Sequence, residues 1–413
     1  MNKINTTLEN TLNNLIIFFP VVFFLRSLTI NITVILISII FIILCITKKY
    51  NFLKYEYNKL LLLFFVYFFS LQFFHDTDLE KIIKSFFLLK FFLLFNATIY
   101  VFSNVDVIKL KKKFLYLSTI ICIFIIDLYI QYYFGKNILG FSPSFCIPGP
   151  GCLRYSGMFG SELVAGGYLS IIGISVFFLL HTLFNKKFNN FVPLIILFSV
   201  FITGERTALI LVILFNLIFL LFYIKIDLKK LLVISLIIFS FIFFSKDVTI
   251  KRYSKDTINL IKNDDNLSLV DSIKTTPWGL HYTASILMIK ENPMFGNGFK
   301  SFREDCSKYK HLNIREQRVH KVCSSHPHNF HLEVMVDSGI LGYLILLTSV
   351  YFFLKRYFQF DELKKNKLVL VMFLYLLTFL FFPRPTGSIL STFFGSMFWY
   401  FVGSILGYTN LKK

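Results

Sequence analysis

The sequence is poor in charged residues and in glycine, and acidic residues are its scarcest charges. Only 16% of the 413 residues are charged, and 19 are glycine against 54 phenylalanine. A soluble domain carries about 25% charged residues, so this composition excludes a soluble globular protein. Hydrophobic residues make up 56% of the chain, which also excludes a disordered polypeptide.

Basic residues outnumber acidic ones by 43 to 23 and leave a formal net charge of +20. This excess does not indicate a nucleic-acid partner, because Lys and Arg form short clusters between long apolar runs. Lys111-Lys112-Lys113, for example, directly precedes the run Phe114–Phe134. Such clusters are typical of membrane proteins, whose cytoplasmic loops are positively charged.

The apolar runs predict an all-α polytopic membrane protein. A helix needs roughly 20 apolar residues to cross about 30 Å of hydrocarbon, and the sequence offers about 12 transmembrane helices. We expect the first to be a retained helix, because no small-residue cleavage site follows it. The candidate runs are Leu12–Leu25, Thr29–Thr47, Leu60–Phe74, Ile82–Phe102, Phe114–Phe134, Glu162–Phe184, Phe191–Gly204, Thr207–Ile226, Leu231–Ser245, Phe330–Leu354, Leu368–Phe382 and Ser388–Tyr408.

The distribution of Lys and Arg predicts the orientation and the domain organisation. Most of these residues fall on one side of the predicted spans, which places that side and both termini in the cytoplasm. The largest hydrophilic stretch, 246–327, then forms one large loop domain on the outer side. Its helix-compatible segments Leu267–Asp271 and His281–Lys290 predict a small folded cap. The cap separates helices 1–9 (residues 1–245) from helices 10–12 (residues 328–413).

Cysteine is also scarce, and four of the six cysteines fall in predicted outer loops: Cys146, Cys152, Cys306 and Cys323. An even number of cysteines in an oxidising compartment favours disulfide bonds. We predict two local bonds, Cys146–Cys152 and Cys306–Cys323, with free thiols or another pairing as alternatives. No C-x-x-C spacing occurs, so a metal site built from these four residues is disfavoured.

Histidines stand at the mouth of the predicted tenth span. His326-Pro327-His328-Asn329 leads into that span, and Pro327 favours a helix start. The positive end of the helix disfavours protonation of a nearby histidine, and a general base must be neutral imidazole. We therefore predict that His328 is a catalytic base and that His326, Asn329 and Glu333 support it.

Other interpretations of these residues involve no catalysis or involve a metal. His328 fits an interfacial histidine bonded to a loop carbonyl, or a zinc ligand together with His320, His326 and His331. The spacing matches no common closed zinc site. The sequence Asp76-Thr77-Asp78 resembles a metal-binding D-x-D pattern, but two aspartates in a short loop are usually solvated. We predict no metal site.

Four stretches resemble the superfamily of O-antigen ligases and O-antigen polymerases. His328-Asn329, nine residues, Gly339, two residues and Gly342 match the pattern H-[NSQ]-x9-G-x-x-[GTY]. Three further motifs of the family have similar stretches here in the same order: 154–160 (RYSGMFG), 204–208 (GERTA) and 291–299 (ENPMFGNGF).

The resemblance implies a fold of the glycosyltransferase C type and glycan transfer at the periplasmic face of a bacterial inner membrane, without a cofactor. The implied donor is a glycan linked to undecaprenyl diphosphate. Guanidinium groups bind phosphate oxygens bidentately, so Arg206 and Arg154 are the predicted diphosphate ligands. The alternatives are snorkelling to lipid headgroups and pairing with Glu205 or Glu162.

The expected reaction is a metal-independent, inverting transfer to an acceptor hydroxyl. The acceptor is the lipid A core in a ligase of lipopolysaccharide biosynthesis, or the next lipid-linked repeat unit in a polymerase. The histidine motif matches the ligase consensus without departure, which favours the ligase. Apart from donor and acceptor, the expected partners are membrane lipids. A transporter of lipid-linked oligosaccharide and a membrane scaffold are the alternatives from other functional classes.

Overall fold

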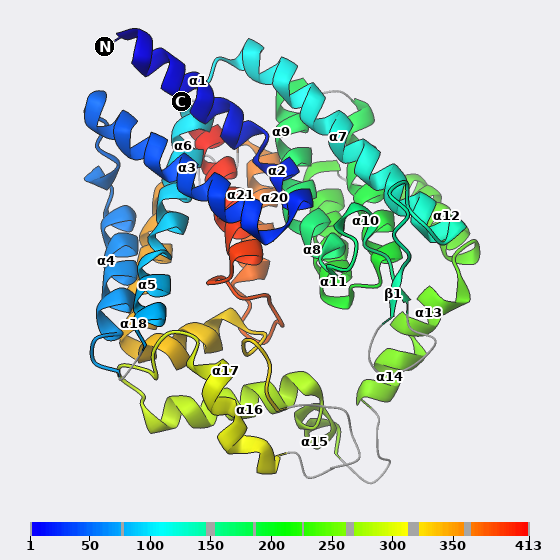
Figure 1. Cartoon of the computed structure of the whole chain (residues 1–413). Helices are drawn as coiled ribbons and strands as arrows, with labels where there is room; N and C mark the ends of the chain where they lie inside the picture. Colours follow the sequence, from blue (N-terminus) through cyan, green and yellow to red (C-terminus); the bar gives the residue numbers. More distant parts are fainter. Residues whose placement is uncertain are drawn as a thin grey trace.

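The computed structural model is an assembly of helices (Figure 1) and describes residues 2–75, 78–145, 153–184, 187–224, 227–261, 268–312, 322–358 and 365–411. Its N-terminal part consists of α1 (Asn2–Ile17), α2 (Phe19–Val22), η1 (Phe23–Leu25), α3 (Arg26–Thr47), η2 (Phe52–Lys54), α4 (Glu56–Leu71), α5 (Leu79–Phe86), α6 (Leu89–Asn104) and α7 (Val107–Phe134).

A short antiparallel pair of strands follows, β1 (Ser144–Phe145) with β2 (Leu153–Arg154), in which Ser144 faces Arg154. The helices of the middle part are η3 (Gly157–Phe159), α8 (Ala165–Tyr168), η4 (Leu169–Gly173), α9 (Ile174–Phe184), η5 (Lys187–Phe191), α10 (Val192–Thr203), α11 (Arg206–Ile218), η6 (Phe219–Ile224) and α12 (Leu228–Phe243). The π-helical segment η4 continues into α9 without a break, and the π-helical segment η6 directly follows α11.

The C-terminal part begins with short helices and ends with long ones. They are α13 (Asp247–Tyr253), α14 (Lys255–Ile261), α15 (Leu269–Lys274), α16 (Pro277–Glu291), α17 (Ser301–Asp305), η7 (Cys306–Leu312), α18 (Phe330–Tyr357), α20 (Lys367–Phe379) and α21 (Thr392–Leu411). The predicted cap helices at Leu267–Asp271 and His281–Lys290 correspond to α15 and α16.

Six helical stretches among the described residues are long and apolar enough to cross a membrane. They are Phe19–Thr47, Leu79–Asn104, Val107–Phe134, Ala165–Phe184, Arg206–Ile224 and Phe330–Arg356. A seventh results if the pair Leu232–Phe243 and Asp247–Ile258, bent by 113°, forms one broken span. The all-α membrane class agrees with this structure, whereas the number of twelve spans stays a prediction.

The first predicted span, Leu12–Leu25, is wrong as a single helix. The chain breaks at Phe18, between α1 and α2, and Pro20 lies in the first turn of α2. Proline has no N–H to donate to the preceding turn, so it favours a new helix start over continuation. The candidate span instead begins at Phe19 and continues through α3.

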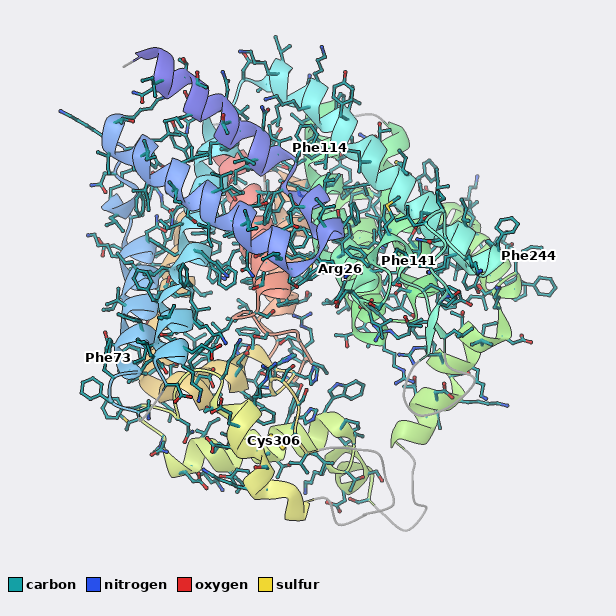
Figure 2. All side chains as sticks on the ribbon, viewed as in Figure 1. Arg26, Phe73, Phe114, Phe141, Phe244 and Cys306 are labelled. Atoms are coloured by element: carbon teal, nitrogen blue, oxygen red, sulfur yellow. A yellow bond between two sulfur atoms is a disulfide. The ribbon has the colours of Figure 1, made fainter. Side chains whose placement is uncertain are left out.

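Large apolar side chains cover the outer surface of the helices. Leu28 and Ile46 of α3 are 72% and 73% exposed, and Phe244 after α12 is 71% exposed. Figure 2 shows Phe73 and Phe244 pointing away from the molecule. A surface this apolar is unfavourable in water and suited to lipid, which agrees with a membrane protein.

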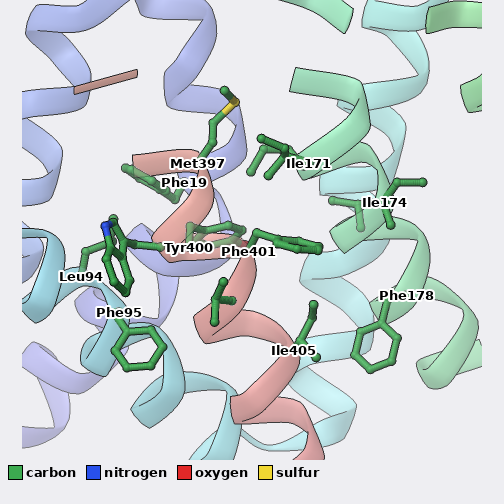
Figure 3. Packing of buried hydrophobic residues seen from close by; sticks show 14 of the residues in the cluster. Phe19, Leu94, Phe95, Ile171, Ile174, Phe178, Met397, Tyr400, Phe401 and Ile405 are labelled. Carbon is green, nitrogen blue, oxygen red and sulfur yellow. The ribbon is translucent and has the colours of Figure 1, made fainter. Parts of the chain in front are cut away.

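The main core is packed around α21. Figure 3 shows Tyr400, Phe401 and Ile405 of α21 between Leu94 and Phe95 on one side and Ile174 and Phe178 on the other. All are buried. Glycine allows α21 to approach α6 closely: a Cβ on Gly407 would lie 2.6 Å from the Cβ of Phe102.

A smaller core lies between α16, α17, η7 and α18. It contains Leu280, Ala284, Met288, Phe302, Cys306, Tyr309, Val322 and Val336. In Figure 1, α16 and α17 lie at the end of the molecule opposite both chain termini. The first part of the predicted cap, α13, does not belong to this smaller core. It packs on α10, where Tyr253 donates a hydrogen bond to the carbonyl of Phe201 (3.0 Å).

Candidate active site

A cavity of about 470 Å³ lies in front of the first turn of α18. Four residues that the sequence predicts for the site line it together: Arg154, Arg206, His326 and His328. The same cavity is lined by Glu205, Arg252, Trp278, Arg384, Thr386 and Ser388. Its volume lies within the range of about 300–1,000 Å³ that is usual for ligand sites.

The backbone of His328 is held in an unusual conformation. Its φ angle is 56°, a region that residues with a side chain seldom adopt and that is enriched at functional sites. The N–H of Thr386 donates to the His328 carbonyl at 2.6 Å. The Nε2 atom of His328 lies 3.1 Å from Oγ of Ser324. These contacts fix the imidazole at the cavity wall.

Three histidine rings pack together at this wall. The ring of His328 is stacked on that of His281, with centroids 5.3 Å apart, and lies 4.2 Å from the ring of His326. Burial lowers the pKa of His328 below 6.5, which leaves its ring neutral at pH 7. Burial and the neighbouring His328 lower the pKa of His326 to about 3. The buried Nε2 atom of His326 has no hydrogen-bond partner among the described residues.

Asn329 and Glu333 lie next to the cavity but do not line it. Asn329 caps α18: its Oδ1 accepts from the N–H of Leu332 (3.1 Å), and its Nδ2 donates to the carbonyl of Phe382 (2.5 Å). Glu333 is 5% exposed, and its Oε2 has no hydrogen-bond partner within the described part of the chain. Through its two hydrogen bonds, Asn329 holds the start of α18, and with it the adjacent His328, in position.

The loop Asn292–Phe299 docks into a break in α18. At Gly339 the φ angle is 69° and the helical hydrogen bonds are interrupted. The N–H groups of Asn297 and Gly298 donate to the carbonyls of Val336 and Asp337 (2.8 and 3.0 Å), and Ile340 donates back to Pro293 (2.8 Å). Gly339 thus makes room for a loop backbone and not for another helix. Gly342 lies against a neighbouring helix, because an added Cβ there would lie 2.9 Å from a ring carbon of Tyr67 in α4.

Three arginines in the lining of the cavity form a group that we call the arginine wall: Arg154, Arg206 and Arg252. Arg154 Nη2 donates to the carbonyl of Leu163 (2.9 Å) and lies 3.3 Å from Glu205 Oε1. Arg206 Nη2 donates to the carbonyl of Arg252 (3.1 Å). The buried Nε atoms of Arg154 and Arg206 have no hydrogen-bond partner in the described ranges.

Local structure explains how the arginine wall is assembled. Arg154 ends β2, and Arg206 begins α11 directly after Glu205. The Glu205 carboxylate accepts from the N–H groups of Gly166 and Gly167 (2.8 and 3.1 Å). A Cβ on Gly166 would lie 2.8 Å from Glu205, so only glycine admits this carboxylate. Burial raises the pKa of Glu205, and Arg154 opposes that rise. The pairing of Arg154 with Glu205 that the sequence left as an alternative is present.

A second group of lining residues, which we call the histidine wall, consists of His326, His328, Thr386 and Arg384. Arg384 and Arg252 also line the cavity, and neither was predicted from the sequence as a site residue. Arg384 stands between two prolines in the loop that joins two apolar runs. A single charged residue in such a short loop is the feature of the sequence that identifies it as a candidate. Arg252 is one of many basic residues in the hydrophilic stretch, and nothing in the sequence distinguishes it.

Cys306 and Cys323 do not line the cavity. Cys306 and Cys323 form a disulfide with Cα atoms 5.3 Å apart, and Figure 2 shows Cys306 beside α17. The predicted bond Cys146–Cys152 lies outside the described residues, as do Asp76 and His320. Within the described ranges, no group of three or more His, Cys, Asp or Glu residues has a geometry suited to a metal ion.

Comparison with known proteins assigns a class to this arrangement. Residues 191–347 match the family model of O-antigen ligase. The matched segment starts before α10, ends within α18 and includes Arg206, His326 and His328. No curated protein matches the chain.

The apolar helices and this match support a membrane protein that contains a domain of the O-antigen ligase type. The match over residues 191–347 confirms the resemblance seen in the sequence.

Proposed function

We propose that this protein transfers a glycan from undecaprenyl diphosphate to a hydroxyl group of the lipid A core, as an O-antigen ligase does. The observation that carries this proposal is the convergence of a neutral histidine and the arginine wall on one cavity. The histidine supplies a base for the acceptor, and the arginines supply positive charge for a leaving diphosphate.

In the proposed reaction, His328 removes the proton of the acceptor hydroxyl. The acceptor oxygen forms a bond to the anomeric carbon of the donor glycan while the bond from that carbon to the diphosphate breaks. The electron pair of the broken bond stays on undecaprenyl diphosphate. Arg206 and Arg154 stabilise the negative charge that develops there. Attack opposite the leaving group inverts the anomeric centre, and no step requires a metal.

The apolar part of the cavity suits a lipid-linked donor. Leu163, Val164, Leu211, Phe393 and Phe394 share the lining with the charged residues. A diphosphate at the bilayer surface brings an isoprenoid chain with it, so a site with both linings accommodates the two parts of the donor. This arrangement supports a cavity at the level of the membrane surface.

We place the cavity and the cap at the periplasmic face of the inner membrane, with both termini in the cytoplasm. The positive loops predicted from the sequence support this orientation. The position of α15–α17 at the end opposite both termini is consistent with it (Figure 1). Accessibility of single cysteines introduced into α16 and at the C-terminus to a membrane-impermeant thiol reagent tests it.

Purified protein in liposomes with a lipid-linked donor tests the reaction. The variant His328→Ala is expected to abolish glycan transfer while the protein keeps its elution profile and melting temperature. His181→Gln is a matched control. His181 is also buried, but it lies in the last turn of α9, where its Nε2 is 2.6 Å from the hydroxyl of Tyr223. Transfer at the normal rate by His328→Ala would contradict the mechanism.

The acceptor is tested in a deletion strain. Loss of a ligase leaves long polymer on the carrier lipid, whereas loss of a polymerase leaves a single repeat unit attached to the core. The second phenotype would replace the ligase by the polymerase of the same superfamily without changing the roles proposed for His328 and Arg206.

A further inference from the structure

We propose that Arg384, on the histidine wall, holds a phosphate oxygen in this cavity, as a second anion-binding position in addition to the arginine wall. This inference rests on the proposed function. It adds a ligand from the loop between α20 and α21, which lies outside the segment 191–347 that matches the O-antigen ligase family.

The loop that carries Arg384 is fastened to the histidine segment on both sides of the arginine. On one side, Asn329 Nδ2 donates to the carbonyl of Phe382 at 2.5 Å. On the other, Thr386 donates its N–H to the carbonyl of His328 (2.6 Å) and accepts at Oγ1 from the N–H of Phe330 (2.8 Å). Arg384 is therefore held at a fixed position relative to the imidazole of His328.

The charge of Arg384 is not balanced by the protein. Its buried Nε has no hydrogen-bond partner, and no ion pair of Arg384 occurs among the described residues. Its guanidinium lies 4.6 Å from the ring centroid of Phe379, a contact that offsets only part of the desolvation cost of a cation. Burial lowers the pKa of Arg384 to about 10, so the group remains charged at pH 7.

The arginine wall has more partners within the protein. Arg154 has the Glu205 carboxylate and a carbonyl as partners, and Arg206 donates to the carbonyl of Arg252. Arg206 thus has a neutral acceptor, whereas the Arg384 guanidinium has neither a hydrogen bond nor an ion pair among the described residues. A desolvated guanidinium in a cavity is stabilised best by an anion that binds it bidentately, and phosphate is the anion that the proposed reaction supplies.

Two sources offer that phosphate: the diphosphate of the donor and a phosphate group on the acceptor. In both cases the phosphate contacts Arg384 on the histidine wall, close to the base. A donor diphosphate would extend across the cavity between the two walls, whereas an acceptor phosphate would bring its hydroxyl to His328.

Binding of inorganic pyrophosphate to the full-length protein in detergent, measured by calorimetry, tests the site without relying on transfer. Arg384→Gln is expected to weaken binding about tenfold or more, since a charge-assisted hydrogen bond contributes about 1.5–3 kcal/mol. Arg356→Gln is the matched control, because Arg356 also lies over an aromatic ring (Tyr55, 5.0 Å) but at the other end of α18. If Arg384→Gln does not fold, Arg384→Lys takes its place, with an expected loss of about threefold from the missing fork geometry.

Steady-state kinetics in liposomes then separate the two sources. A higher KM for the donor alone identifies the donor diphosphate, and a higher KM for a phosphorylated acceptor alone identifies the acceptor phosphate. Unchanged pyrophosphate affinity, or a wild-type protein that does not bind pyrophosphate, would overturn the inference. His328→Ala is expected to retain pyrophosphate binding, so failure of the catalytic proposal is distinguishable from failure of this one.

Discussion

The two walls of the cavity are built on different principles. The arginine wall consists of side chains from β2, α11 and α13 that are held by a buried carboxylate and by backbone carbonyls. The histidine wall consists of a backbone segment with an unusual φ angle, fastened to the loop between α20 and α21. The arginine wall thus supplies positive charge from a partly neutralised cluster. The histidine wall supplies the base and the single charge of Arg384 from a segment that is held by backbone hydrogen bonds.

The largest effect is expected on the arginine wall. Arg206→Ala should lower kcat/KM for transfer by about 10²–10³-fold, which is typical when one group that stabilises developing charge is removed. The melting temperature should change little, because Arg206 pairs only with a carbonyl in the described structure. Transfer assays in liposomes and thermal unfolding in detergent measure both quantities.

Arg154→Ala provides the internal comparison for that prediction. It leaves Glu205 buried without its cation, so it should lower stability as well as transfer. Adding Glu205→Gln should restore the stability but not the transfer. Equal loss of transfer and stability in Arg206→Ala would show that both arginines are structural.

The sequence allowed prediction of most of the site because the site depends on local patterns. Arg154, Arg206, His326 and His328 each lie in a short motif at the end of an apolar run, and all four line the cavity. Which of them pair with protein groups depends on contacts between distant segments. The pairing of Arg154 with Glu205 is such a contact, and the sequence left it open.

Other features require knowledge of tertiary structure. Arg384 becomes a site residue only because Thr386 is bonded to the backbone of His328, across 58 positions in the sequence. The break at Gly339 is hidden from a hydropathy pattern, which predicts one continuous span there. Short helices such as α4 and α20 also lie below the length that identifies a span, so composition alone does not fix their number.

The second effect concerns the loop that docks into the break of α18 at Gly339. A Cβ on Gly339 would lie 2.1 Å from the backbone oxygen of Met294, at a φ angle of 69°. Backbone cannot yield as a side chain can, so Gly339→Ala should cost about 3 kcal/mol or more of stability. It should also reduce transfer. Thermal unfolding and activity of the purified variant measure the two losses.

Gly342→Ala is the matched control. Its added Cβ would meet the Ser338 hydroxyl at 2.4 Å and a ring carbon of Tyr67, both of which belong to side chains that can move. Its stability loss should therefore be smaller than that of Gly339→Ala. The reverse order would mean that the docked loop Asn292–Phe299 contributes less than the contact between α18 and α4.

The smallest expected effect is the pH dependence of transfer, which depends on the histidine wall and not on the arginine wall. The pKa of His328 is lowered below 6.5 by burial, so the active neutral base is lost only as the pH falls through that lowered value. The acid limb of kcat/KM for transfer should accordingly lie below pH 6.5. A limb above 6.5 would mean that a group other than His328 is the base.

Stability should change with pH over a window set by His326. Its pKa is about 3 in the folded protein and about 6.5 in the unfolded chain, so the unfolded chain binds more protons between these values. The free energy of unfolding should therefore fall as the pH drops from 6.5 towards 3. His326→Gln should reduce this dependence, whereas Arg206→Ala should leave it unchanged, because an arginine neither gains nor loses a proton in this range. Unfolding in detergent at a series of pH values measures the slope, and an equal slope in His326→Gln would place the acid-sensitive group elsewhere.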